Sequence, residues 1–446
     1  MSANTKIGSK PRVIVLGIDG VPFSFLQKRF KQGGMKSFAA LADRGDMKRM
    51  RTVVPPISSV AWTSFMTGKN PAKHGVFGFV ERNPETMEMK IPTRRELRTE
   101  TLTEVLSRYG KYVVQMNVPC SYPPTSVNGK LVSGFLATSL DKATYPKDFY
   151  KELESMGYVI DVDSWKARTD RDGFLDDIFH ALEMRLKATL HLIDKEPWDF
   201  FISHIMETDR IAHFFWEFME NNDPVYGERV LDFFEKVDKF IDSVQKAIRP
   251  EDNLIILSDH GFCTLEKEVY VNNALIEAGF LKLNTDQPKS PKDIHPSSIA
   301  YSMIPGRFYV NLKGRESTGC VEPGNEYEEV RKKLRELLMN LKDPETGGNI
   351  IKKVFMKEEV YKGDYFDEAA DVVVLPFDGY DLKGNLKGPA LTDKGYINGM
   401  HTDWDATLFV RNSKIIVDDP VITDLMPSIL NIYQIKGEDI DGRIIF

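Results

Sequence analysis

The sequence has little cysteine, and its three cysteines, Cys120, Cys263 and Cys320, lie far apart. This spacing contains no CxxC pair, which argues against a disulfide framework and against a thiolate zinc site. No apolar run is long enough to span a bilayer, and the first ten residues, MSANTKIGSK, lack the apolar segment of a secretion signal. These features together predict a cytoplasmic protein with no membrane span.

An excess of basic residues is also missing, because the 446-residue chain has a formal net charge of -7 at pH 7. This acidic balance argues against binding to duplex nucleic acid, which depends on a broad basic surface. A small anionic substrate remains compatible with it, because bound cations can invert the local field. Nothing in the sequence indicates the oligomeric state.

Short apolar runs rich in β-branched residues alternate with helical patterns along most of the chain. Buried strands are predicted at 11–18 (PRVIVLGI), 198–206 (WDFFISHIM) and 253–258 (NLIILS). Helical periodicity is present at 102–110 and 172–193. The alternation predicts an α/β fold, in which a doubly wound, mostly parallel sheet carries helices on both faces.

Residues 263–400 are less regular than the rest of the chain. They contain a loop rich in proline, aspartate and lysine, a predicted strand at 307–312 and a highly charged predicted helix at 326–342. We therefore expect a core of residues 1–262 and 401–446. The segment 263–400 is predicted to be an insertion that forms part of a cap and partly returns to the core sheet.

Side chains that can bind a metal ion follow several predicted strands. A carboxylate follows the strand at 11–18, and an Asp-His pair follows the strand at 253–258. A further Asp and His are four residues apart and would share one face of a helix. Each group alone is explained by turn, capping or loop chemistry. Because α/β sheets place their sites at strand ends, we expect a common cluster of Asp19, Asp209, His213, Asp259, His260 and His401.

Three carboxylates and three imidazoles, without a thiolate, suit two divalent ions of mixed nitrogen and oxygen coordination. Zinc is the first candidate, and manganese or iron is also compatible with such ligands. A pair of ions can activate a nucleophile and stabilise charge in an in-line displacement at phosphorus.

Two neighbouring hydroxyls, Ser58 and Ser59, lie in the stretch PPISSVAWTSFMTGKNPAKHG at 55–75. Locally they fit a turn and a helix start. A metal ion bound to one serine oxygen would favour its alkoxide, so no neighbouring general base would be needed.

The order of these segments resembles that of the alkaline phosphatase superfamily, in particular its type I phosphodiesterase/nucleotide pyrophosphatase branch with its archaeal and bacterial members. The resemblance covers nearly the whole chain. It depends on the segments VIVLGIDG, TSFMTGKNPAKHG, METDRIAHFFW, ILSDHGF and GMHTDW.

The resemblance implies a role for each residue of the cluster. One ion would be bound by Asp209, His213 and His401, and the other by the remaining three side chains together with the nucleophile. In this branch the nucleophile is usually threonine, a fixed distance before Thr-Gly, and the count from Thr67 leads to Ser58. The amide of Ser59 would then face the phosphate near a helix start, where anions are favoured.

This sequence departs from the branch at two positions. Ser58 replaces the usual threonine, and Phe79 stands where nucleotide pyrophosphatases carry an asparagine that contacts a phosphate oxygen. Basic residues that could replace that contact are Arg82, Lys69 and Lys73, although each also fits an ordinary surface charge. Other residues that could lie near the site are Asn117 after a strand, His204 as a supporting or core residue, and His74 as a brace of its loop.

The implied function is hydrolysis of a small phosphoester or nucleotide by two metal ions, through a covalent phosphoseryl-type intermediate. Alternatives on the same metal core are a phosphomonoesterase, a phosphonate hydrolase, an enzyme like phosphoglycerate mutase, and a metal-binding relative without catalysis. The mutase branch inserts a large domain after its serine, whereas here the chain runs directly into Thr67. A sulfatase is disfavoured because SSVAW lacks the Cys/Ser-x-Pro-x-Arg pattern.

Overall fold

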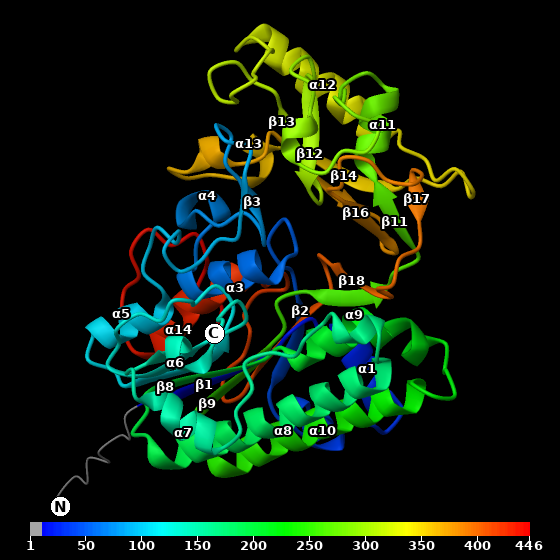
Figure 1. Ribbon diagram of the computed structural model, residues 1–446. Coiled ribbons are helices and arrows are strands. Elements are labelled where there is room, and N and C mark those ends of the chain that lie inside the picture. Colours follow the sequence, from blue (N-terminus) through cyan, green and yellow to red (C-terminus); the bar gives the residue numbers. More distant parts are fainter. Residues whose placement is uncertain (1–10) are drawn as a thin grey trace, which may run out of the picture.

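The computed structural model of the protein describes residues 11–446 (Figure 1). The first ten residues, where we expected no secretion signal, lie outside the described part. Among the helices of residues 11–446, none is long and apolar enough to cross a membrane.

A twisted sheet forms the centre of the core, and within residues 11–446 it contains eight strands in the order β2-β19-β9-β1-β8-β5-β6-β7. Its five inner strands from β9 to β6 are parallel, and the predicted α/β fold is confirmed. The strands are β1 (Val13–Ile18), β2 (Asp46–Met50), β5 (Val113–Val118), β6 (Gly129–Ser133), β7 (Thr144–Tyr145), β8 (Phe200–Ile205), β9 (Asn253–Leu257) and β19 (Ala406–Val410).

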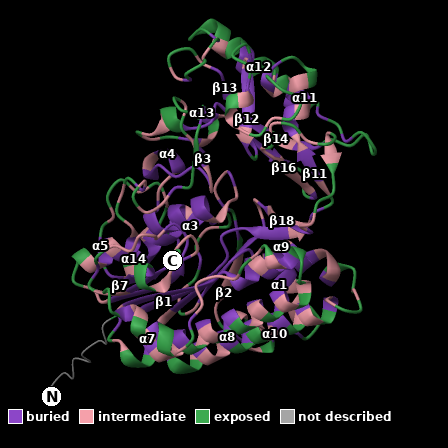
Figure 2. Cartoon of the chain, viewed as in Figure 1, coloured by how far each residue is buried: buried purple, intermediate pink, exposed green. Residues whose placement is uncertain are grey.

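Helices cover both faces of this sheet because its strands are apolar on both sides. In β1, Ile14 and Leu16 pack in one buried cluster, whereas Val13 and Val15 pack in another on the opposite face. Figure 2 shows the strands buried and the outer sides of α8 and α10 exposed. The first cluster includes α1 (Phe23–Lys31), α2 (Lys36–Ala42), α6 (Leu140–Ala143), α7 (Phe149–Ser155), α8 (Arg171–Lys195), α9 (Glu207–Glu220) and α10 (Gly227–Ala247). The second includes α3 (Ser58–Thr67), α5 (Leu102–Arg108) and α14 (Leu425–Ile432).

The insertion forms a cap with its own apolar core, above α3 and α9 in the view of Figure 1. One cap sheet has the order β12-β13-β15-β14, and another has the order β16-β11-β17. The elements are β11 (Lys267–Tyr270), α11 (Val271–Glu277), β12 (Ala300–Ile304), β13 (Arg307–Val310), α12 (Asn325–Met339), β14 (Ile351–Met356), α13 (Lys357–Val360), β15 (Val372–Pro376), β16 (Tyr380–Lys383) and β17 (Thr392–Asp393).

The expectation that part of 263–400 returns to the core sheet is wrong. In the described chain, strands β11 to β17 pair only with one another. The chain leaves and re-enters the core through an antiparallel pair, β10 (Gly261–Thr264) and β18 (Gly399–Thr402). The strand that rejoins the core sheet is β19, which pairs antiparallel with both β9 and β2.

Two short elements of the core extend toward the cap. Helix α4 (Pro71–His74) follows α3, and the hairpin of β3 (Glu81–Arg82) and β4 (Met89–Lys90) comes after it. Figure 1 shows β3 rising between α4 and β13. Phe77 and Met87 belong to the cap's apolar cluster, so this segment joins the two parts of the molecule.

Candidate metal centre

The carboxyl ends of three neighbouring strands bring the acidic residues together. Strands β1, β8 and β9 are adjacent and parallel. Asp19 follows β1, Asp259 follows β9, and α9, which carries Asp209, begins just after β8. His401 arrives from the far end of the chain on β18, where it is paired with Phe262 of β10. All six residues that the sequence grouped therefore meet at one edge of the sheet.

One group of converging atoms comes from α9 and β18. The Asp209 Oδ1 atom lies 3.3 Å from the Nε2 atoms of both His213 and His401. The two Nε2 atoms are 3.0 Å apart. Asp209 and His213 face the same way because they are one helical turn apart. The imidazoles are partly exposed, so this side of the centre is open.

The other group is fully buried. The Nε2 atom of His260 lies 3.4 Å from Asp19 Oδ1 and 3.4 Å from Asp259 Oδ2, and all three side chains are 0% exposed. The amide of Gly20 donates to Asp259 Oδ1 at 3.2 Å. Gly20 has a positive φ of 69°, and a Cβ atom there would lie 2.8 Å from the Phe262 ring, so only glycine fits this turn.

The distances fit metal coordination. Two atoms that each lie about 2.1 Å from one tetrahedral ion are about 3.4 Å apart. Asp209 Oδ1 and Asp259 Oδ2 are buried and accept no hydrogen bond from any residue within 11–446. Burial and the neighbouring Asp19 carboxylate raise the pKa of Asp259 well above its usual value, and a cation would relieve this repulsion. The Asp and His donors present therefore fit divalent ions.

The imidazoles are held with Nε2 facing the centre. The Nδ1 atoms of His213, His260 and His401 lie 3.1, 3.0 and 2.8 Å from the carbonyl oxygens of Gly399, Gly261 and Pro56. Because a carbonyl only accepts, each Nδ1 must carry the proton. Each Nε2 then presents a lone pair, as a metal ligand requires.

The two candidate groups adjoin each other. A ligand atom of His260 lies within 4.8 Å of ligand atoms of both Asp209 and His401, as well as of Asp19 and Asp259. The rings of His260 and His401 stack with their centroids 3.5 Å apart. This closeness is compatible with a pair of ions about 3.5–4 Å apart.

Ser58 lies against the buried group at the first turn of α3. Its Oγ is 3.1 Å from His260 Nε2 and 3.4 Å from Asp19 Oδ1. The hydroxyl of Ser59 is buried and has no hydrogen-bond partner among the described residues. The first amides of a helix lack intrahelical partners, so the amides at this turn can bind an anion beside Ser58.

Residues around Asp19 fix its carboxylate. Asp19 Oδ2 lies 2.7 Å from His204 Nε2 and accepts the indole N–H of Trp62 at 2.9 Å. The Thr208 hydroxyl donates to the Asp19 carbonyl at 2.7 Å. The sequence suggested His204 either as support or as a core residue, and it did not suggest Trp62 or Thr208. The available signal for Trp62 was its spacing of one helical turn from Ser58.

Phe79 belongs to an aromatic stack near the open side. Its ring lies parallel to that of Phe135, with centroids 5.0 Å apart, and the Arg210 guanidinium covers Phe135 at 5.2 Å. Arg210 also donates to Asp209 Oδ2 at 3.2 Å. Phe79 is therefore connected to a candidate ligand through two stacked groups. Asn117 is buried near the end of β5 with a positive φ of 64°, and its side-chain polar atoms have no partner among residues 11–446.

The structure places the basic candidates away from the converging ligands. Arg82 pairs with Glu316 at 2.8 Å and lies over the Tyr309 ring at 4.0 Å. Lys69 and Lys73 both pair with Asp439 on the surface.

His74 lies under the loop after α4. The amide of Val76 donates to His74 Nδ1 at 3.1 Å, and His74 Nε2 lies 3.0 Å from the Ser64 hydroxyl. Burial lowers the pKa of His74 to about 3, so the ring stays neutral at pH 7. The neutral ring links α3 to the loop.

An apolar pocket of about 240 Å³ opens beside the candidate metal ligands. His213, His401 and Ile57 line its core side, and Val374, Leu382 and other cap residues line the opposite side. It thus reaches from the residue before Ser58 to the cap.

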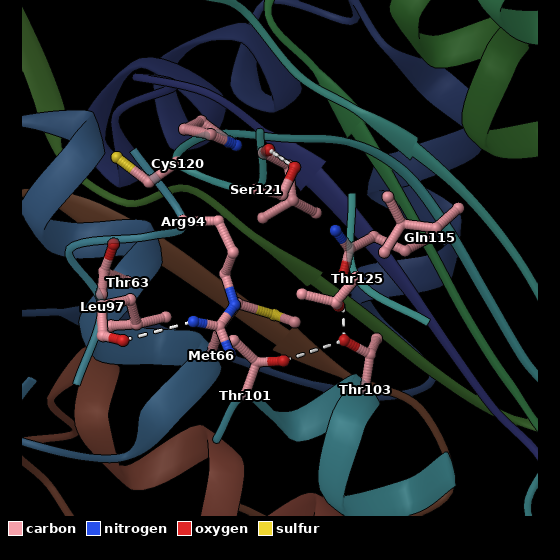
Figure 3. A pocket seen from close by; sticks show the side chains of 13 residues that line it. Thr63, Met66, Arg94, Leu97, Thr101, Thr103, Gln115, Cys120, Ser121 and Thr125 are labelled. Atoms are coloured by element: carbon pink, nitrogen blue, oxygen red, sulfur yellow. Dashed lines mark hydrogen bonds between the residues drawn. The ribbon is translucent and has the colours of Figure 1, made fainter. Parts of the chain in front are cut away.

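A second cavity lies against α3 but is too small for a substrate. Figure 3 shows Thr63 and Met66 of α3, Cys120 and several hydroxyl side chains around it. Its volume is about 20 Å³, enough for about one water molecule.

Comparison with known proteins gives a family and a fold. Residues 13–404 match the model of a family described as type I phosphodiesterase / nucleotide pyrophosphatase. No curated protein matches the sequence significantly. Phosphonoacetate hydrolase from Sinorhizobium meliloti 1021, in complex with phosphonoformate, has a similar structure, with a TM-score of 0.65, 15% identity and 94% of each chain covered.

Two ectonucleotide pyrophosphatase/phosphodiesterase 5 structures are also similar, each with 97% of both chains covered. The murine protein in complex with AMP gives a TM-score of 0.59 at 13% identity, and the human protein gives 0.58 at 14%. At these identities the likeness shows a shared fold.

Proposed function

Because the chain belongs to the type I phosphodiesterase/nucleotide pyrophosphatase family, we propose that it is a two-metal phosphodiesterase with Ser58 as its nucleophile. The observation that carries the proposal is the Ser58 hydroxyl, which lies 3.1 Å from His260 Nε2 beside two converging ligand groups. Asp19, Asp259 and His260 would hold one ion, and Asp209, His213 and His401 the other.

When bound, the ions would stabilise the serine alkoxide and neutralise the charge that develops on the phosphoryl oxygens. Ser58 Oγ forms a bond to phosphorus while the bond from phosphorus to the leaving oxygen breaks. The proton that Ser58 gives up passes to solvent, and the leaving oxygen takes up a proton from solvent and departs as an alcohol. Water then attacks the phosphoseryl group and releases Ser58, so the net reaction is hydrolysis of one ester bond.

The protein's own residues orient this reaction. His204 and Trp62 fix the Asp19 carboxylate, and backbone carbonyls fix the three imidazoles. The amides at the start of α3 face the phosphate, where the helix dipole favours an anion. Such preorganised groups need no rearrangement when charge develops.

The apolar pocket beside His213 and His401 suits an organic substituent of the ester. A phosphate with an apolar or aromatic group would bury that group against Ile57 and Leu382. Phe79 stands where nucleotide pyrophosphatases carry an asparagine that contacts the phosphate, and its aromatic ring also favours a substrate with an apolar or aromatic group. We therefore include small diesters with aryl groups in the substrate class.

The location and the metal are part of the same proposal. Cys120, Cys263 and Cys320 are free. This agrees with a cytoplasmic enzyme, and the donor set agrees with zinc, manganese or iron.

The test combines elemental analysis of the purified protein with a substrate panel. The panel holds 4-nitrophenyl phosphate, bis(4-nitrophenyl) phosphate and phosphonoacetate, each assayed with added Zn²⁺ or Mn²⁺. We expect bound divalent metal and the fastest turnover on the diester. Faster turnover of phosphonoacetate or of the monoester would replace the diester assignment, and metal content without any turnover would favour a non-catalytic protein.

The nucleophile is tested by Ser58→Ala, with Ser59→Ala as the matched control. We expect Ser58→Ala to lower kcat on the diester by about three orders of magnitude or more, because the attacking oxygen is removed. Ser59→Ala removes a hydroxyl without hydrogen bonds and should keep kcat within about twofold. Wild-type turnover in Ser58→Ala at unchanged metal content would contradict the assignment.

A further inference from the structure

Another pocket lies between the β3–β4 hairpin of the core and strand β13 of the cap. Its volume is about 470 Å³. Arginines from both parts of the molecule line it: Arg82, Arg307 and Arg315. The candidate metal ligands and Ser58 are not among its lining residues.

Arg307 is the unusual member of this group. The residue is only 1% exposed, yet it forms no ion pair within residues 11–446. Nη1 donates to the Phe77 carbonyl at 2.9 Å, and Nε has no partner among the described residues. The guanidinium lies flat on Gly78, where a Cβ atom would approach Nη2 to 2.0 Å. Burial of a charge without a counter-charge costs free energy, and a bound anion would lower this cost for Arg307.

Arg82 has unused donors in the same pocket. Its side chain is 5% exposed and pairs with Glu316 at 2.8 Å. Its Nε and Nη1 atoms are buried and have no partner in the described chain. Arg315, in contrast, is satisfied, because it pairs with both Glu316 and Asp371.

The acidic side chains that line the pocket do not form an ion pair with Arg307. The acidic residues exposed at its rim are Glu85, Asp367 and Glu368. Glu81 is buried and accepts the Phe77 amide at 2.8 Å. Burial raises the pKa of Glu81, although Arg307 opposes this effect, and Glu81 is not within ion-pair distance of Arg307.

We propose that this pocket binds a small oxyanion, a phosphate or a carboxylate, between Arg82 and Arg307. The planar fork of a guanidinium matches both kinds of anion and forms charge-assisted hydrogen bonds with them. Bound there, the anion joins β3 of the core to β13 of the cap. Arg307 contacts Phe77 and Gly78, so the bound anion is also connected to the loop that carries Phe79. This site is independent of the proposed hydrolysis.

Calorimetric titration of the full-length, metal-loaded protein with inorganic phosphate, and separately with malonate, tests the proposal. Phosphate can also bind the metal centre, and Asp209→Asn weakens that event because it removes one candidate ligand. We expect Asp209→Asn to retain a binding event with at least one of the two anions. Adding Arg307→Gln or Arg82→Gln should weaken that event about tenfold or more, because each removes a charged donor.

Arg335→Gln is the matched control, since Arg335 is an exposed cap arginine that pairs with Glu359 outside the pocket. It should leave the affinity unchanged. Thermal unfolding of each variant identifies loss of fold. If Arg307→Gln unfolds, the same titrations are made with Arg82→Gln and Arg307→Lys. Unchanged affinity in the folded arginine variants, or no anion bound in Asp209→Asn at millimolar concentration, overturns the proposal.

Discussion

At the scale of single residues, His204 is a side chain outside the candidate ligand set that contacts one of its members. It lies 2.7 Å from Asp19 Oδ2, and both side chains are completely buried. The Trp62 indole contacts the same oxygen and packs edge-on against the His204 ring. Asp19 can then direct its other oxygen to His260 and Ser58.

We expect His204→Ala to weaken metal binding about 10- to 100-fold. Without its hydrogen bond to His204, the Asp19 carboxylate is no longer held in one orientation. Calorimetric titration of metal-free protein with Zn²⁺ measures this change. Excess metal should restore much of the turnover, which a loss of the nucleophile would not allow. His180→Ala is the control, since His180 is exposed on α8. Equal Zn²⁺ affinity in wild type and His204→Ala would rule out the orienting role.

The six candidate ligands could be grouped from the sequence because Asp and His residues near the ends of predicted strands form a local pattern. Counting from Thr67 also singled out Ser58. The sequence alone could not place Arg82, which pairs with Glu316 of the cap, or reveal Thr208, whose partner is a backbone carbonyl. Such contacts depend on tertiary packing between distant segments, and no local pattern encodes them.

At the scale of elements, the contact between α9 and β18 sets the spacing of one ligand group. A Cβ atom on Gly399 would lie 2.1 Å from the Ala212 carbonyl oxygen. The Gly399 carbonyl in turn accepts from His213. Glycine is therefore needed for the strand to approach the helix this closely.

Gly399→Ala should push β18 away from α9 and separate His401 from His213. We expect at least a tenfold loss of Zn²⁺ affinity, about 1.4 kcal/mol, measured by calorimetry. The matched control is Gly348→Ala, because a Cβ atom there meets only the Thr346 hydroxyl at 3.2 Å and the Tyr380 hydroxyl at 4.0 Å. Unchanged affinity in Gly399→Ala would show that the strand can shift without disturbing the ligands.

The connection between α3 and the following loop should make stability depend on pH through His74. Its pKa is about 3 in the folded protein and about 6.5 in an unfolded chain. Between these values the unfolded state binds the proton and the folded state does not, so stability falls as the pH falls. From pH 7 to pH 5 this contribution is about 2 kcal/mol.

Urea unfolding at pH 7 and pH 5 measures this effect. The wild type should lose about 2 kcal/mol more than His74→Asn, which has no imidazole to titrate. The exposed His180→Asn should behave as wild type. The same pH dependence in His74→Asn and wild type would refute the assignment.

The core strands and most long helices were predictable because their apolar patterns are local. The strand at 11–18 became β1, and the helical pattern at 172–193 became α8. The pairing of β19 between β9 and β2 was not predictable, since strand order depends on contacts far apart in the chain. For the same reason the sheets of the insertion were wrongly expected to return to the core.

At the scale of the whole molecule, the core supplies the candidate chemistry and the cap supplies one wall of the apolar pocket. Ile397 also lines this pocket, close to where the cap rejoins the core, and packs against the core's apolar cluster. The cap should therefore control which ester groups are accepted.

Ile397→Asn should raise KM for bis(4-nitrophenyl) phosphate about fivefold to tenfold and leave kcat nearly unchanged, because binding area is lost. Methyl 4-nitrophenyl phosphate, with one aryl group, should be less affected. Met339→Asn is the control, since Met339 is exposed on α12 of the cap and does not line the pocket. An equal rise in KM for both esters, at an unchanged unfolding midpoint, would contradict the apolar role of this pocket.

The pairing of β10 with β18 also constrains how the protein is made. His260 precedes the cap and His401 follows it, so the whole insertion is synthesised between two candidate ligands. A ribosome that has released only 400 residues holds a chain with the proposed nucleophile but without the last candidate imidazole. The nascent protein therefore cannot assemble both proposed metal sites until the cap has emerged, and the proposed hydrolysis would begin only with a nearly complete chain.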